Sequence, residues 1–92
     1  MTVKVKLFAT LRESVGTNEI ELSATDVKDL LNKLESKYKA LKGKFFKDQD
    51  RKKLKDNIII IKKGRNIIYL EGLETELEDN DEISIFPSVG GG

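Results

Sequence analysis

The chain has 92 residues, so we expect a single domain with one modest hydrophobic core and little room for an internal cofactor pocket. Its 17 lysines and arginines nearly balance its 16 aspartates and glutamates, and it has neither cysteine nor histidine. Disulfides, thiolate nucleophiles and the commonest zinc ligands and general bases are therefore excluded.

The N-terminal residues, MTVKVKLFAT, lack the apolar core and small-residue cleavage site of a signal peptide. The longest apolar run, IIII, is far too short to span a membrane. We therefore expect a cytoplasmic protein with no membrane partner.

The first part of the chain predicts two paired strands. Apolar side chains alternate with lysines over residues 3–7, which is the period of a half-buried strand. ATLRESVG follows as a short helical turn closed by Gly16, and residues 19–22 alternate again. We expect these two strands to pair antiparallel.

The apolar period then changes to that of a helix. One stripe with spacings of three and four contains Val27, Leu30, Leu31, Leu34, Tyr38 and Leu41. We expect a helix from Asp26 to Ala40, with Thr25 as its N-cap and Gly43 ending it.

The second half predicts shorter elements. Residues 42–56 have no period and predict an irregular or briefly helical connection. Residues 57–61 predict a strand, KKGRN a turn, and residues 67–69 a further short strand. Residues 71–81 are acidic and predict turns with one tight helical turn, and residues 83–86 predict the last strand, which a proline ends.

This order of elements predicts an α+β fold, with a mixed sheet of about five strands and one main helix packed on one face. If the last strand lies parallel to the first at the middle of the sheet, the arrangement is a β-grasp. We expect the domain to occupy residues 1–89 and to be followed by a flexible tail of residues 90–92.

The tail consists of Gly90, Gly91 and Gly92. A segment without side chains can thread a channel too narrow for any Cβ and present the terminal carboxylate inside a partner. That carboxylate must be activated, as an acyl phosphate or acyl-adenylate, before a thiol, sulfide or amine can attack it. The alternative is a loose end without function.

The outer face of the sheet is a candidate partner surface. Only alternate side chains of residues 58–61 can reach the helix, so the other two must face outward. Phe8 and Phe86 have the outward parity of their strands and are expected beside them. In the alternative, the loop carrying Phe45 and Phe46 folds over this face and covers it.

Charge is unevenly placed along the chain. Residues 42–56 carry seven bases and three acids, whereas residues 71–82 carry seven acids and no base. Because the net charge is only +1 and no RNA-binding signature is present, we interpret the basic stretch as a solvated loop and expect no nucleic-acid partner. The acidic stretch has no calcium-loop pattern, and we expect it to steer a basic partner. We expect no metal, no bound cofactor and no catalytic residue in this chain.

The sequence resembles the MoaD/ThiS group of ubiquitin-like β-grasp proteins and is closest to its archaeal MoaD-like branch. The resemblance rests on VKVKLFATLRESVG, on TDVKDLLNKL and above all on GRNIIYLEGLETELEDNDEISIFPSVGGG. The family's usual ending, Phe-Pro-Pro-Val-x-Gly-Gly, matches residues 86–92, with Ser88 in place of the second proline and Gly90 at the variable position.

The resemblance implies a carrier, at most the non-catalytic small subunit of molybdopterin synthase. A ubiquitin-activating-enzyme-like adenylyltransferase would use MgATP to adenylate the Gly92 carboxylate, and a sulfur donor would then form a thiocarboxylate. In molybdenum cofactor biosynthesis, the tail would enter the molybdopterin synthase large subunit and deliver its sulfur. The resemblance also places the docking surface for partners, at Phe86, Pro87, Val89 and Phe8.

The same resemblance extends to small archaeal modifier proteins and to the eukaryotic ubiquitin-related modifier. These proteins are joined through the C-terminal glycine to lysines of target proteins, and some also serve tRNA thiolation. Chemistry up to the adenylate is shared and only the nucleophile differs, so both routes stay open. A third hypothesis is a plain interaction module with an inert tail.

Overall fold

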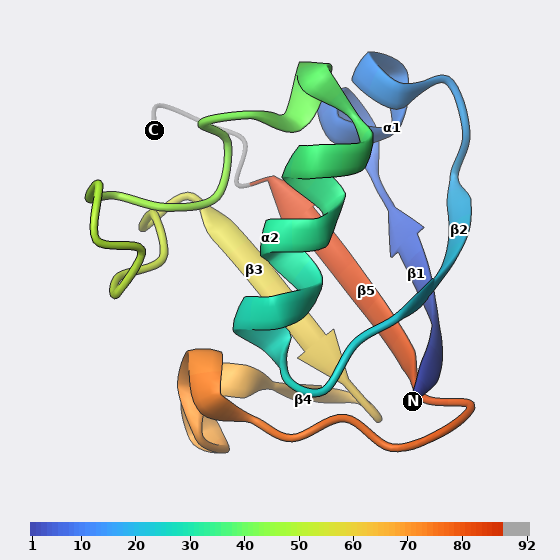
Figure 1. Ribbon diagram of the computed structural model, residues 1–92, viewed down its shortest axis with the longest axis vertical. Helices are drawn as coiled ribbons and strands as arrows, with labels where there is room; N and C mark the ends of the chain where they lie inside the picture. Colours follow the sequence, from blue (N-terminus) through green and yellow to red (C-terminus); the bar gives the residue numbers. More distant parts are fainter. Residues whose placement is uncertain (88–92) are drawn as a thin grey trace.

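The computed structural model describes residues 1–87. The first half contains β1 (Thr2–Leu7), α1 (Ala9–Val15), β2 (Glu19–Ser23), the main helix α2 (Val27–Lys37) and the 3-10 turn η1 (Lys39–Leu41). The second half contains β3 (Ile58–Lys62), β4 (Arg65–Asn66), the 3-10 turns η2 (Ile67–Tyr69) and η3 (Gly72–Glu74), and β5 (Glu82–Pro87) (Figure 1).

The five strands form one mixed sheet in the order β2-β1-β5-β3-β4. β1 pairs antiparallel with β2 and parallel with β5, and β5 pairs antiparallel with β3. Both central predictions are confirmed: the N-terminal strands form an antiparallel pair, and the last strand lies beside the first at the middle of the sheet. The fold is therefore an α+β ubiquitin-like β-grasp.

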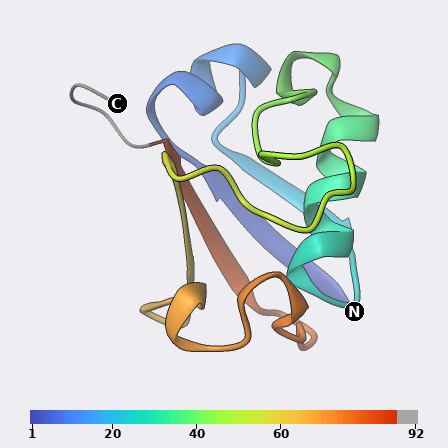
Figure 2. The same ribbon diagram turned by 90° about the vertical axis from the view of Figure 1, so that its left-hand side faces the viewer.

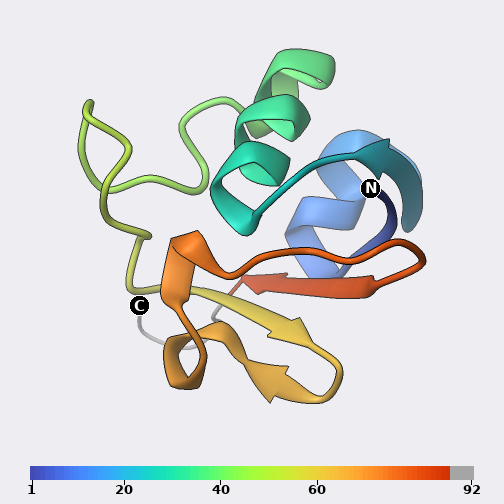
Figure 3. The same cartoon turned by 60° about the horizontal axis from the view of Figure 1, so that its bottom comes forward.

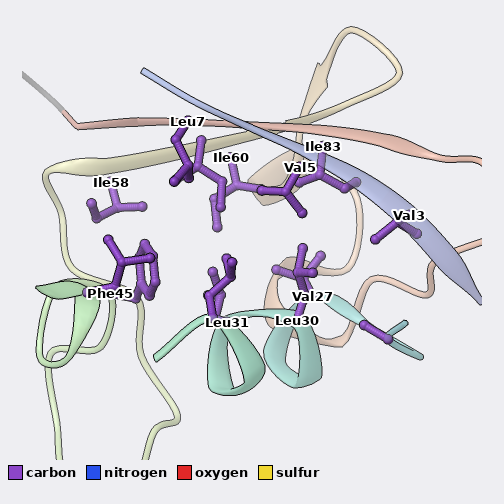
Figure 4. Packing of buried hydrophobic residues seen from close by; sticks show 14 of the residues in the cluster. Val3, Val5, Leu7, Val27, Leu30, Leu31, Phe45, Ile58, Ile60 and Ile83 are labelled. Carbon is purple, nitrogen blue, oxygen red and sulfur yellow. The ribbon is translucent and has the colours of Figure 1, made fainter. Parts of the chain in front are cut away.

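The core lies between the sheet and α2. Figure 4 shows strand residues Val3, Val5, Leu7, Ile58, Ile60 and Ile83 pointing toward Val27, Leu30 and Leu31 of the helix. Their neighbours along β1 and β5 are exposed or half-buried. The alternation in the sequence thus arises because the helix covers only one face of the sheet.

The loop between η1 and β3 closes one end of this core. Phe45 is fully buried and lies beside Ile58 in Figure 4, and Phe46 is 8% exposed. Figure 2 shows the loop on the same side of the sheet as α2. The alternative in which this loop covers the outer face is therefore wrong, since its two aromatic rings fill the helix side instead.

An ion pair holds this loop against α2. The Arg51 guanidinium donates to the Glu35 carboxylate at 3.0 Å and to the Asn32 side-chain oxygen at 2.9 Å, and lies 5.2 Å from the Phe46 ring centre. The second oxygen of Glu35 accepts from the Gly43 N–H at 3.2 Å. Because the Glu35 side chain is only 6% exposed, these bonds compensate a charge that would otherwise be costly to bury.

The start of α2 differs from the prediction by one residue. Asp26, not Thr25, is the N-cap, and its carboxylate accepts from the Asp29 N–H at 2.7 Å. The Asp29 carboxylate in turn accepts from the Thr25 N–H at 3.0 Å. Two reciprocal side-chain bonds thus fix where the helix begins.

Helix α2 also ends earlier in the chain than the sequence predicts. The helix stops at Lys37 because Tyr38 is extended, with φ −123° and ψ 108°. The 3-10 turn η1 follows and keeps Leu41 buried, so the apolar stripe extends beyond the end of the helix. Gly43, with φ +79°, lies beyond η1 rather than at the helix end.

Asp29 gives the helix start a pH dependence. The Thr25 N–H, and then Lys33, lower the pKa of this carboxyl below its ordinary 3.8, against the opposing effect of burial. A lowered folded-state pKa stabilises the fold above the unfolded pKa, and this stability is lost as pH falls through the folded value.

We expect Asp29→Asn to lower the free energy of unfolding by about 0.3–1 kcal/mol at pH 7. The difference from the parent chain should shrink as urea unfolding is repeated at pH values below 4. Asp50→Asn, which removes an exposed loop carboxylate, is the matched control. A deficit that persists unchanged at the lowest pH contradicts the assignment.

The segment after β3 is only partly as predicted. The KKGRN turn is confirmed, with positive φ at Lys63 and Gly64, as in a two-residue hairpin turn. The predicted strand at residues 67–69 is wrong, because β4 stops at Asn66, whose side chain accepts from the Ile68 N–H at 3.1 Å. Those three residues form η2, and the tight turn expected in the acidic stretch is η3.

Candidate functional site

The strand that leads to the predicted tail is held on both sides. Ile85 of β5 faces Leu7 of β1, and Pro87, the last described residue, faces Ile58 of β3. Whatever follows Pro87 therefore starts from a central strand rather than from an edge, which is a rigid base for a functional end. Val89 and Gly90–Gly92 lie outside the described residues, as does the predicted boundary between residues 89 and 90.

Three apolar side chains gather at this end of the outer face. The rings of Phe8 and Phe86 are stacked, with centroids 4.3 Å apart and planes inclined by 13°. Ile59 lies opposite Phe86 in the β3–β5 pairing and is 38% exposed. We call Phe8, Phe86 and Ile59 the terminal row. The predicted parity of Phe8 and Phe86 thus brings both rings to one place.

The outer face becomes polar away from the terminal row. Lys6 and Ser84 face each other across β1 and β5, and the Lys6 ammonium forms an ion pair with Glu82 at 3.1 Å. Figure 2 shows α2 and the loop before β3 on the opposite side of the sheet. Apart from the half-buried Ile61, which lies opposite Ser84, the apolar side chains that β1, β3 and β5 place on this face lie beside Pro87, where a partner that binds the tail would make contact.

One titratable group with a shifted pKa, Lys63, lies at the end of β3 that is away from the terminal row. The Glu78 carboxylate, and then Asp81, raise the pKa of Lys63 in the turn at the far end of β3. Among residues 1–87, no group of three or more acidic side chains is arranged to hold a metal ion. Within the same residues, no helix combines the length and apolar character needed to cross a bilayer. What the terminal row offers is apolar and aromatic contact.

One exposed apolar surface was not predicted from the sequence. Ile68 and Tyr69 are 64% and 79% exposed, which makes them more exposed than Ile59. Their residue types favoured a buried strand. The signal that could have corrected this was Asn66, because a side chain that bonds a nearby backbone N–H competes with strand pairing.

Comparison with known proteins gives a consistent result. The model of the ThiS family matches residues 5–92. The chain is 37% identical to small archaeal modifier protein 3 of Haloferax volcanii and 36% identical to a protein of Archaeoglobus fulgidus described as a candidate sulfur carrier, each over the full length of both chains. The solution structure of small archaeal modifier protein 1 from Methanosarcina acetivorans is 52% identical and has a TM-score of 0.89, covering 99% of this chain and 96% of its own. The chain belongs to the ThiS family, within its small ubiquitin-like modifiers and sulfur carriers.

Proposed function

We propose that this chain is a sulfur carrier that is activated at Gly92. The terminal carboxylate attacks the α-phosphate of MgATP in the adenylyltransferase, forming an acyl-adenylate and releasing pyrophosphate. Hydrosulfide supplied by the sulfur donor then attacks the acyl carbon and AMP leaves, which gives a thiocarboxylate with no change of oxidation state. The chain supplies the terminus and the docking surface, and its partners supply the proton transfers.

The observation that carries this proposal is the place in the sheet where β5 ends. β5 pairs with β1 on one side and β3 on the other, and it ends at Pro87 beside the stacked pair of Phe8 and Phe86. The glycine ending follows Pro87 in the sequence. A slender segment on a fixed base can enter a narrow active site while the base is held outside it. The likeness to a candidate sulfur carrier supports the same role.

Within this role, we place the chain as the small subunit that serves molybdopterin synthesis. The tail of residues 90–92 would enter the large subunit and give its sulfur to the cofactor precursor. The terminal row, with Pro87 and Val89, would hold the surface of that subunit or of the adenylyltransferase.

Protein modification is a second candidate function. It is favoured by the sequence similarity of this chain to two small archaeal modifier proteins. In this role, a lysine ε-amine of a target displaces AMP from the same acyl-adenylate and forms an amide bond with Gly92.

The intact mass of the protein from its source cells distinguishes these roles. A thiocarboxylate is heavier than the acid by the difference between sulfur and oxygen, whereas modification gives lysines that carry a glycine remnant after proteolysis. A wild-type chain found only as the free acid, in cells whose activating enzyme is active, contradicts both roles and favours the inert tail.

We expect Phe86→Asp to weaken binding to the adenylyltransferase by about 10- to 100-fold, because a charge replaces the ring at the centre of the terminal row. Titration calorimetry measures the affinity. Ser36→Asp, which adds the same charge on the exposed side of α2, is the control and should bind normally. Equal affinities for the two variants contradict the docking surface.

A further inference from the structure

The edge strand β2 has one side that no other described strand occupies. It lies at the opposite edge of the sheet from β4 (Figure 3) and pairs with β1 alone. The Leu7 N–H donates to the Asn18 carbonyl at 2.9 Å. At the other end of the strand, the Ala24 N–H donates to the Met1 carbonyl at 2.8 Å. Because backbone bonds alternate sides along a strand, residues 18, 20, 22 and 24 bond β1, and the N–H and C=O groups of residues 19, 21 and 23 point away from the sheet. We call these outward groups the free edge.

Side chains of the chain itself satisfy both ends of the free edge. The Thr17 hydroxyl accepts from the Glu19 N–H at 3.4 Å and donates to the Glu19 carbonyl at 3.3 Å. The Lys33 ammonium donates to the Ser23 carbonyl at 2.6 Å. No further side chain of residues 1–87 bonds the free edge, so its centre keeps three open groups, which are the N–H and C=O of the exposed Glu21 and the N–H of Ser23. Such a line of backbone groups is what an extended segment pairs with when it adds a strand to a sheet.

The side chains beside the free edge differ between the two faces of the sheet. Glu19 and Glu21 are exposed on the outer face. On the helix side, Ile20 is buried and Leu22 is half-buried. Glu19 forms an ion pair with Lys4 at 3.7 Å, and Glu21 forms none within the described part of the chain. An added strand would therefore place every second side chain beside carboxylates and the intervening ones beside apolar side chains.

The strand that β2 already pairs with shows which pattern suits it. Lys4 of β1 lies opposite Glu21, and the other outward lysine of that strand lies opposite Glu19. Val3 and Val5 of β1 point to the helix (Figure 4). A strand on the free edge would meet the same two glutamates and the same helix-side residues. The complementary pattern is thus lysine or arginine in alternation with an aliphatic residue.

A second copy of this chain fits the free edge less well. An antiparallel pair of β2 strands aligned over all five residues would place the two Glu21 side chains directly opposite each other. Like charges in that position destabilise a strand pair, and charged side chains on an edge strand oppose self-association. The charge pattern therefore favours a basic strand from a different protein.

We propose that the free edge of β2 binds another protein by strand addition, through an extended segment in which lysine or arginine alternates with aliphatic residues. An antiparallel segment would exchange two backbone bonds with Glu21 and accept a third from the Ser23 N–H. Its basic side chains would lie beside Glu19 and Glu21, and its aliphatic side chains beside Leu22. The contact needs no activated terminus, so it goes beyond the proposed function and is independent of it.

The test uses a peptide of about eight residues, the length of a strand, in which valine and lysine alternate. It is titrated into the isotopically labelled full chain, and amide hydrogen exchange is followed by nuclear magnetic resonance. In the free chain, the Glu21 N–H should exchange quickly, whereas the Leu22 N–H, which bonds β1, should be protected. Saturating peptide should slow the exchange of the Glu21 N–H by at least about tenfold.

Methylation of the peptide's backbone nitrogens separates strand addition from charge attraction, with the wild-type chain in every arm. The lysine opposite Glu21 directs its N–H toward β2, because these two residues exchange their backbone bonds. Methylated lysine N–H groups should therefore weaken binding by at least about tenfold. Methylated valine N–H groups, which point away from β2, should leave binding within about threefold.

Charge reversal tests the partner's pattern. Glu21→Lys should weaken binding of the valine–lysine peptide by about tenfold and should bind a valine–glutamate peptide, which the wild type should not bind. Glu13→Lys, which makes the same change on the exposed side of α1, is the matched control. Unchanged melting temperatures would show that both variants fold.

Three results would overturn the proposal. Unslowed exchange at Glu21 with saturating peptide would remove the contact, and equal binding of the peptide with methylated lysines would reduce it to charge attraction. A wild-type dimer in which Glu21 is protected without peptide would assign the free edge to a second copy of the chain.

Discussion

Removing Gly91 and Gly92 is expected to abolish adenylation of the chain by its activating enzyme. Each extended residue spans about 3.4 Å, so the truncation withdraws the carboxylate by roughly 7 Å from the α-phosphate. A displacement of about 1 Å can already cost about 100-fold in rate, so the exchange of pyrophosphate into ATP should fall below detection.

The same truncation should leave stability almost unchanged. Among residues 1–87, the buried core residues all lie between Val3 and Ile85. We expect a change of less than about 0.5 kcal/mol in the free energy of unfolding, as for a surface substitution. Replacing both glycines with alanine keeps the length and tests slenderness separately, and it should also slow exchange strongly. A truncated chain that is activated at the normal rate contradicts this account.

Phe45→Ala is expected to be the most damaging single substitution in the loop before β3. The ring is fully buried at the end of the core beside Ile58 (Figure 4), and the Lys55 N–H donates to the Phe45 carbonyl at 2.8 Å. Truncating a buried phenylalanine costs about 3–5 kcal/mol, while a chain of this length has roughly 5–14 kcal/mol in total. The melting temperature should fall by about 15–30 °C.

Phe8→Ala is the matched control for this prediction. It removes the same side chain from a half-buried position on the outer face, so we expect a cost of about 1 kcal/mol and weaker partner binding. Urea unfolding of both variants measures the two costs. If the two substitutions cost the same, the ring of Phe45 does not close the core as described.

The strands were predictable because a single helix covers a single face of the sheet. Because of that arrangement, apolar residues recur with a period of two in β1 and β5 and form a helical stripe in α2. The central position of the last strand followed from the element order. The stacking of Phe8 on Phe86 depends on the register between β1 and β5, which parity alone does not specify.

The predictions that were wrong concern elements in which a local contact overrides the secondary-structure preference of the residues. Thr25 and Asp26 are both good N-caps, and the reciprocal bonds with Asp29 select Asp26. At η2, a side-chain acceptor on Asn66 replaces strand pairing, although the sequence of β-branched and aromatic residues favours a strand. The fate of Phe45 and Phe46 required the geometry of the core, because nothing local says which face a loop covers.

The central claim is that the carboxylate of Gly92 is the group that the activating enzyme adenylates. Trapping the activated form of this carboxylate tests the claim most directly. The full chain is incubated with its activating enzyme, MgATP and hydroxylamine, and the C-terminal peptide is weighed by mass spectrometry. The account predicts a hydroxamate at Gly92 that forms only with ATP. A free carboxylate at Gly92, from an enzyme that does activate another carrier in the same assay, would contradict it.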